Sequence, residues 1–219
     1  MRKLAAGIAF LALFFIVLVS AIEHTAYDRA YYETFQRAHY IDEVTGRTAQ
    51  ELKGVSEDVI SYLRNGDEAL MRRNFGERET LHMRDVYLLF SMARTIRLAS
   101  AGVLCLLLAF QWKKGSFRLF VREVDIAALV FLILFLGVAV LAASQFSKAF
   151  VLFHHLFFDN DLWLLNPETD LMIQMMPEPF FVGMAVRIAV KTALGVAAGL
   201  VLLNFAGHFR SGTERKECV

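Results

Sequence analysis

The sequence of 219 residues has little cysteine, little proline and almost no net charge. Its two cysteines, Cys105 in an apolar run and Cys218 at the penultimate position, form no CxxC pair, so we exclude a disulfide scaffold and a paired-cysteine metal site. The three prolines all lie between residues 167 and 179, which leaves no proline-rich linker. With 23 basic and 22 acidic residues the net charge is +1, so nothing favours nucleic acid as a partner.

Charge is also absent from several long stretches of the chain. The sequence is 57% hydrophobic and 21% charged, against about 45–50% and about 25% in soluble domains. A helix of about 20 apolar residues crosses the hydrocarbon core of a bilayer. We therefore expect an all-α membrane protein with a single membrane domain over residues 1–219. The predicted spans cover about residues 4–22, 91–111, 125–146 and 181–206.

The first of these stretches has a second interpretation. Residues 1–22 begin with a basic pair and end with Val19-Ser20-Ala21, which resembles a signal-peptide cleavage site. Its apolar run is longer than a signal peptide normally has, so we expect a retained span.

The positions of lysine and arginine predict the orientation in the membrane. Four spans place nine flanking basic residues on one side, which is then the cytoplasmic side. These residues are Arg2, Lys3, Lys113, Lys114, Arg118, Arg122, Arg210, Arg215 and Lys216. Both termini are then cytoplasmic, and the segments at about 23–90 and 147–180 are extracytoplasmic.

The first extracytoplasmic segment has helical periodicity. Apolar residues recur at helical spacing between Leu52 and Leu63, and Asn65-Gly66 is a typical helix end. A further helix is expected to begin near residues 77–80 and to continue into the second span.

Polar groups gather on the predicted outer side, where five of the six histidines lie. Glu79, His82 and Asp85 are spaced three apart, so a helix would place them on one face. A carboxylate beside an imidazole raises its basicity and fixes its tautomer. The same spacing also occurs in solvated helix ends with incidental charge pairs.

A second polar group follows the third span. His154 and His155 are followed by Asp161, Trp163 and Glu178. An aromatic belt at the membrane interface accounts for tryptophan and phenylalanine, but not for this number of histidines and acids near hydrocarbon. In the last span Arg187 either extends to lipid headgroups, pairs with Glu178 or Asp161, or binds an anionic lipid group.

Familiar catalytic patterns are weak or missing. His154 and Asp159 have the histidine-x4-aspartate spacing of glycerolipid acyltransferases, but the pair would face away from cytoplasmic acyl donors. No HExxH motif supports a zinc site, and no GxSxG motif supports a serine nucleophile.

Three separated motifs resemble those of the lipoprotein intramolecular transacylases, a family of small four-span bacterial membrane proteins. They are Glu79-x-x-His82-Met83-x-Asp85-Val86, His154-x-x-Phe157-Phe158-x-Asn160-Asp161-x-Trp163 and Asp170-x-x-Ile173-x-x-x-Pro177-Glu178-x-Phe180-Phe181. The resemblance implies a substrate, the diacylglyceryl-modified N-terminal cysteine of a bacterial lipoprotein. It also implies a reaction, transfer of the sn-2 acyl chain to the α-amino group of that cysteine, which gives the lyso-form lipoprotein.

The resemblance implies no cofactor and no metal, and it places the enzyme in the bacterial cell membrane. We expect His154 and His82 to be the catalytic acid and base, with Asp85 orienting His82. The residues expected to support the site or bind substrate are Asp85, His155, Asp161, Trp163, Glu178 and Arg187. The remaining alternatives are a membrane sensor or accessory protein, and a metal-dependent membrane hydrolase. The sequence leaves the oligomeric state open.

Overall fold

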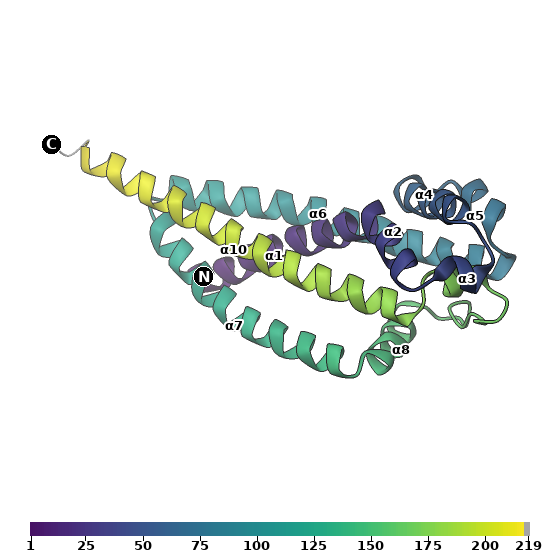
Figure 1. The fold of residues 1–219 in the computed structure, drawn as a ribbon. Coiled ribbons are helices and arrows are strands. Elements are labelled where there is room, and N and C mark those ends of the chain that lie inside the picture. Colours follow the sequence, from purple (N-terminus) through teal and green to yellow (C-terminus); the bar gives the residue numbers. More distant parts are fainter. Residues whose placement is uncertain (217–219) are drawn as a thin grey trace. The chain divides into compact units, whose positions relative to one another are not determined.

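The computed structural model describes residues 1–216, so Cys218 lies outside the described part of the chain. The described residues form helices and connecting loops without any strand (Figure 1), which confirms the expected all-α class. The helices are α1 (Arg2–Ala26), α2 (Arg29–Ala38), α3 (Ile41–Thr45), α4 (Ala49–Asn65), α5 (Glu68–Asn74), α6 (Glu77–Lys113), α7 (Phe117–Ser144), α8 (Phe146–Phe157), α9 (Leu171–Met175) and α10 (Glu178–Lys216).

Four helices are long and apolar enough to cross a membrane: α1, α6, α7 and α10. This confirms the expectation of four spans, while the side on which the termini lie stays a prediction. The expectation that the second spanning helix begins near residues 77–80 is also confirmed, because α6 runs without interruption from Glu77 to Lys113.

The chain divides into two compact units. Among the described residues, the first contains 1–21, 94–141 and 188–216, and the second contains 22–93 and 142–187. The four long helices therefore each contribute to the first unit, and the short helices belong to the second.

The core of the first unit is aromatic and closely packed. Phe10, Phe14, Phe120 and Val196 are buried in it. The ring centroids of Phe14 and Phe131 lie 4.6 Å apart in an edge-to-face arrangement, which suits the quadrupoles of the two rings. These contacts join residues of α1, α7 and α10.

Two glycines allow α10 to approach α1 closely in this unit. A Cβ atom at Gly195 would lie 2.6 Å from Cγ1 of Val17, and one at Gly199 would lie 3.0 Å from Cδ1 of Leu13. Helix pairs in membranes commonly use small residues in this way, because dispersion contacts replace the hydrophobic driving force.

Local signals determine where the helices of the second unit begin and end. Thr48 and Glu51 form a reciprocal capping box at the start of α4. Gly66 follows the helix in the left-handed conformation, with φ of 75°. The helix end expected at Asn65-Gly66 is thus confirmed. The apolar positions expected to form its inner face are buried: Leu52, Val55, Val59, Ile60 and Leu63.

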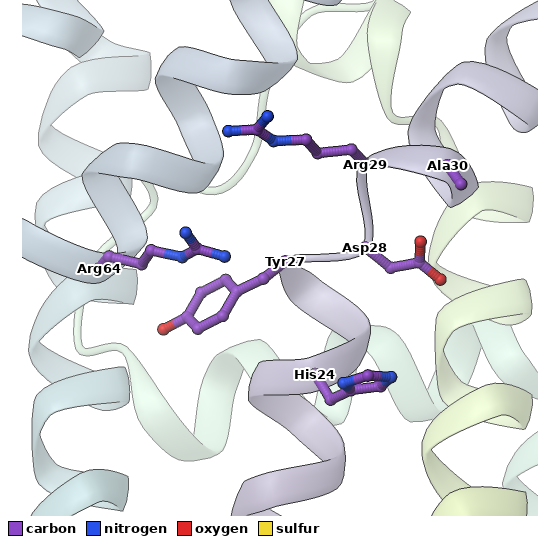
Figure 2. Close-up of a pocket in the computed structure, with 6 residues that line it drawn as sticks. All are labelled: His24, Tyr27, Asp28, Arg29, Ala30 and Arg64. Carbon is purple, nitrogen blue, oxygen red and sulfur yellow. The ribbon is translucent and has the colours of Figure 1, made fainter.

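A cavity of 530 Å³ lies where α1 ends and α2 begins. Its lining residues are His24, Tyr27, Asp28, Arg29, Ala30 and Arg64. Figure 2 shows the guanidinium group of Arg64 over the ring of Tyr27, at 4.6 Å from the ring centroid. This contact joins the end of α4 to the end of α1 within the second unit.

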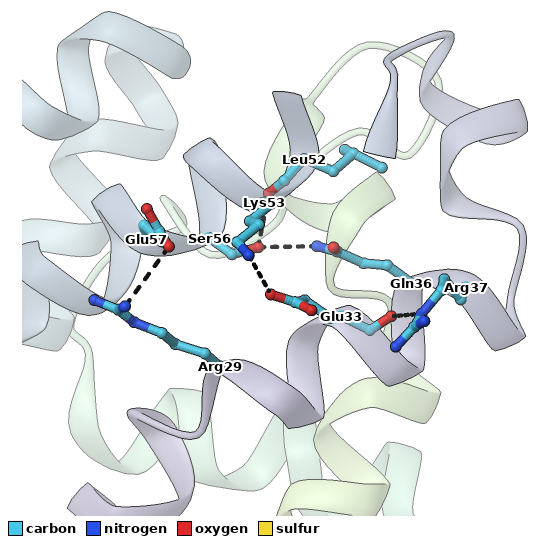
Figure 3. A network of polar contacts seen from close by, with 8 residues as sticks. All are labelled: Arg29, Glu33, Gln36, Arg37, Leu52, Lys53, Ser56 and Glu57. Carbon is cyan, nitrogen blue, oxygen red and sulfur yellow. Dashed lines mark hydrogen bonds and ion pairs between the residues drawn. The ribbon is translucent and has the colours of Figure 1, made fainter. Parts of the chain in front are cut away.

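Polar contacts join α2 to α4 (Figure 3). Two ion pairs at the surface link Arg29 to Glu57 at 3.7 Å and Lys53 to Glu33 at 3.3 Å. Exposed pairs of this kind contribute about 0–1 kcal/mol each. The buried side chain of Gln36 donates a hydrogen bond to Oγ of Ser56 at 2.9 Å, and losing such a partner costs about 1–3 kcal/mol. The buried bond therefore specifies the pairing of the two helices more strongly than the ion pairs do.

We expect Gly195→Ala to lower the stability of the purified protein by about 1–3 kcal/mol, because its Cβ would overlap Val17, whose side chain is stiff. Thermal unfolding in detergent measures this. Gly137→Ala is the matched control, since a Cβ there meets nothing within 4 Å and alanine favours the helix. Equal effects of the two substitutions would contradict the close approach.

Candidate active site

A buried carboxylate fixes the start of α6 in the second unit. Glu79 is 5% exposed, and its Oε2 accepts a hydrogen bond from the backbone N–H of Gly76 at 2.7 Å. Its Oε1 accepts another from the backbone N–H of Met172 at 2.7 Å. Both bonds compensate the cost of burying the charge, and the bond from Met172 ties α6 to α9. His82, one turn further along α6, thereby has a fixed position relative to α9.

His82 and His154 lie next to each other inside the second unit. They are 9% and 6% exposed, and their ring centroids are 6.0 Å apart. The Phe158 ring packs against both, at 5.4 Å from His82 and 5.6 Å from His154. The structure thus brings together the two histidines that the sequence predicted as catalytic, although they are 72 residues apart in the chain.

The hydrogen bond of His154 determines its tautomer. Its Nδ1 lies 2.7 Å from the carbonyl oxygen of Phe150, one helical turn earlier on α8. A carbonyl oxygen only accepts hydrogen bonds, so Nδ1 carries the proton and the neutral ring has its lone pair on Nε2. Burial lowers the pKa of this imidazole, the Phe150 carbonyl opposes that shift, and the nearby His155 adds to it. His154 is therefore a neutral base with one free acceptor nitrogen near pH 7.

Trp163 forms one wall of the site. Its ring stacks on His154 with centroids 4.6 Å apart and an interplanar angle of 29°. The exposed His155 meets the same indole edge-on at 5.3 Å. Trp163 and His155, which the sequence analysis named as supporting residues, thus contact each other beside His154.

The loop after α8 is attached to α6 by side chains from both. Asp85 Oδ2 accepts a hydrogen bond from Nδ2 of Asn160 at 2.9 Å, and Arg78 donates one to the backbone carbonyl of Asp161. We expected Asp85 to orient His82, but in this structure its carboxylate bonds to Asn160, and Nδ1 of His82 has no hydrogen-bond partner. Asn160 and Arg78 were absent from our predicted site residues.

The two remaining predicted residues lie on α10. Glu178 Oε1 accepts a hydrogen bond from the hydroxyl of Ser147 at 2.7 Å, which joins the start of α10 to the start of α8. Arg187 lies 3.9 Å from Asp28 and 4.5 Å from the Tyr31 ring centroid. The suggested pairing of Arg187 with Glu178 or Asp161 is therefore replaced by pairing with Asp28.

Other kinds of site find little support in the described residues. Within residues 1–216 no three histidine, cysteine, aspartate or glutamate side chains are arranged to hold a metal ion. The cavity beside Tyr27 is lined by none of the predicted catalytic or supporting residues. A neutral imidazole with one free ring nitrogen can accept a proton, so proton transfer is the chemistry that His154 offers.

A comparison with protein-family models decides the assignment. The model of "Lipoprotein intramolecular transacylase Lit" matches residues 7–181. The chain belongs to this family. The resemblance carried by the three motifs is thereby confirmed, and so is the assignment to a family of acyl-transfer enzymes.

Solved structures of a lipoprotein intramolecular transacylase have the same fold. The membrane-integral transacylase Lit from Bacillus cereus is 25% identical to this chain, with a TM-score of 0.76 over 100% of this chain and 99% of that one. Two structures of the same Bacillus cereus protein have one histidine replaced, by arginine or by alanine. They are 24% identical, with TM-scores of 0.76 and 0.75. The chain is accordingly a multi-pass membrane protein.

A relative known by sequence covers less of the chain. An uncharacterized protein of Aquifex aeolicus (strain VF5) is 32% identical over 145 residues. The match covers 65% of this chain and 60% of that protein, so this transacylase family member spans less than two thirds of that relative.

We expect Glu79→Gln to lower the stability of this transacylase family member by about 1–3 kcal/mol. The oxygen of the glutamine amide can still accept one of the two hydrogen bonds. Its NH2 group then faces the other backbone N–H, and two donors cannot bond to each other. Chemical or thermal unfolding of the purified protein measures the change. Glu77→Gln, at an exposed position of the same helix, is the control, and an equal loss in both variants would contradict the anchoring role.

Because the pKa of His154 is lowered in the folded protein, we expect its ring to titrate below the ordinary value of about 6.5. The neutral ring then contributes stability above pH 6.5, and this contribution is lost as the pH falls through the lowered pKa. NMR of ¹⁵N-histidine-labelled protein in detergent measures the titration, with His154→Gln to assign the signal. A midpoint at or above 6.5 would contradict the environment described.

Proposed function

We propose that the chain catalyses intramolecular acyl transfer in bacterial lipoproteins. The sn-2 acyl chain of the diacylglyceryl-cysteine moves to the α-amino group of the same cysteine, and the product is the lyso-form lipoprotein. The observation that carries this proposal is the buried pair of His82 and His154, in a chain that belongs to the transacylase family.

The amine attacks the ester in its neutral form, and its nitrogen gives up one proton as the new C–N bond forms. An α-amino group has a pKa of about 7.7–8.0, so part of it is neutral at neutral pH. Nε2 of His154 is the free acceptor nitrogen that takes the proton lost in the attack, because Nδ1 is held by the Phe150 carbonyl. The departing glycerol oxygen needs a proton in turn, and His82 lies close enough to take part in returning it.

The reaction needs no nucleophilic residue. Amine and ester belong to one substrate molecule, and holding them in the reactive pose supplies on the order of 7–11 kcal/mol of the barrier. The protein therefore has to fold the substrate, exclude water and move protons. The neutral imidazole of His154, buried among aromatic rings beside His82, suits that task.

The supporting residues act by positioning. Asp85 works through Asn160 to hold the loop that carries Trp163, and Asp161 adds its backbone carbonyl as a second attachment to α6. Glu178 joins α10 to α8 through Ser147. We assign to Arg187 the positioning of α10 against Asp28, and to His155 the support of the indole.

The site faces the extracytoplasmic side in this proposal. The flanking basic residues favour cytoplasmic termini, so residues 23–90 and 147–180, which carry His82 and His154, would lie on the extracytoplasmic side. A lipoprotein anchored by its acyl chains in that leaflet would present both its ester and its amine there.

We expect His154→Gln and His82→Gln each to reduce lyso-form lipoprotein on the order of 10²-fold or more, the range of general acid–base catalysis. The chain is expressed in a bacterium that lacks the activity, and lipoprotein N-termini are analysed by mass spectrometry. His39→Gln is the control, because that histidine is exposed and its ring stacks on Phe35, not on His82 or His154.

Protein amount and thermal unfolding are measured for each variant, which separates loss of activity from loss of folding. Wild-type levels of lyso product from both His154→Gln and His82→Gln would overturn the catalytic assignment. No lyso product from the unaltered chain would overturn the proposed function.

A further inference from the structure

Two polar atoms beside His154 are buried without a hydrogen-bond partner. They are Nδ1 of His82 and Nε1 of Trp163. Only four buried side-chain nitrogen or oxygen atoms in the described residues lack a partner, and these two belong to rings that contact His154. Burying a polar atom without a hydrogen-bond partner costs about 1–3 kcal/mol of stability. Such an atom beside a candidate base therefore indicates that a ligand supplies the missing partner.

The indole of Trp163 is held in a fixed orientation. It stacks on His154 on one side, and His155 packs against it edge-on. Its backbone carbonyl accepts a bond from the N–H of Leu165 at 3.0 Å, and the preceding Asn160 is bonded to Asp85 on α6. The direction of the indole N–H is therefore set before substrate binds.

The unpartnered group has a definite chemistry. An indole nitrogen donates a hydrogen bond and accepts none. His154 cannot supply a second donor while its Nε2 is the base, because its N–H is committed to Phe150. A substrate that accepts a hydrogen bond from the indole N–H of Trp163 must therefore have an acceptor oxygen. That oxygen must lie next to the atom that His154 deprotonates.

We propose that Nε1–H of Trp163 donates a hydrogen bond to the carbonyl oxygen of the sn-2 ester and stabilises the oxyanion that forms there. This inference rests on the proposed function. The amine nitrogen bonds to the ester carbon, the C=O π pair moves onto oxygen, and the amine proton passes to Nε2 of His154. The C=O bond then re-forms, the bond to the glycerol oxygen breaks, and that oxygen takes the proton. The products are an amide and a free hydroxyl.

The arrangement suits an oxyanion site for an energetic reason. A buried donor held in a fixed orientation needs no reorganisation when negative charge develops, so it binds the transition state better than the ester. Because the uncharged ester gains less from the same donor, losing it should lower kcat more than it raises KM.

The sharpest test replaces Trp163 with β-(3-benzothienyl)alanine, which keeps the size and stacking of indole but has sulfur in place of N–H. Conversion of a synthetic diacylated lipopeptide by purified protein is followed by mass spectrometry. We expect kcat to fall on the order of 10²-fold, with KM within about threefold and an unchanged unfolding temperature. Trp163→Phe should show a comparable loss in kcat.

The matched control is the same replacement at Trp112, the second of the two tryptophans and a residue of the first unit. It should leave kcat unchanged. Wild-type kcat in the Trp163 replacement, or a raised KM with unchanged kcat, would overturn the oxyanion role while leaving the proposed function standing. Failure of the unaltered protein to convert the lipopeptide would instead overturn the proposed function.

Discussion

The hydrogen bond between Nδ1 of His154 and the carbonyl oxygen of Phe150 is the contact on which the chemistry of the site depends. It places the ring proton on one nitrogen and leaves the lone pair on the other. Burial among aromatic rings then keeps the imidazole neutral by lowering its pKa. One turn of α8 and the aromatic rings around it therefore make His154 a neutral, buried base with a fixed orientation.

Other contacts in the second unit hold His82 and Trp163 in place beside His154. Glu79 ties the start of α6 to α9, and the Asp85–Asn160 pair ties the loop after α8 to the same face of α6. His82 on α6 and Trp163 on the loop are held against His154 by these two attachments. Glu79, Asp85 and Glu178 thus connect segments that are distant in sequence, and the two histidines form no ion pair with them.

Much of the fold follows from patterns within short stretches of sequence. Four apolar runs were enough to predict the spans, and the spacing of Leu52, Val59 and Leu63 predicted the inner face of α4. The starting point of α6 was also predictable. These features depend on periodicity and helix-end chemistry, which neighbouring residues determine. The two histidines were identifiable by residue type and by their place in the motifs.

The partners of the charged residues were not predictable in the same way. Spacing placed Asp85 on the face of His82, but its carboxylate bonds to Asn160, 75 residues later. Arg187 pairs with Asp28 from the other end of the second unit's sequence. Side-chain partners of this kind depend on how separated segments pack, and a single sequence contains no record of that packing. The bond between His154 and the Phe150 carbonyl is an exception that the sequence could have indicated. On a helix, the carbonyl four residues earlier lies within reach of a histidine side chain.

The acceptor for His154 is a main-chain atom, and this has a consequence for how the site tolerates genetic change. Substituting residue 150 alters its side chain but leaves the carbonyl in place, provided that α8 persists. Mutations at position 150 therefore leave the tautomer of His154 unchanged. The Asp85–Asn160 attachment has no such protection, because each partner is a side chain, and its preservation requires two codons to be maintained together.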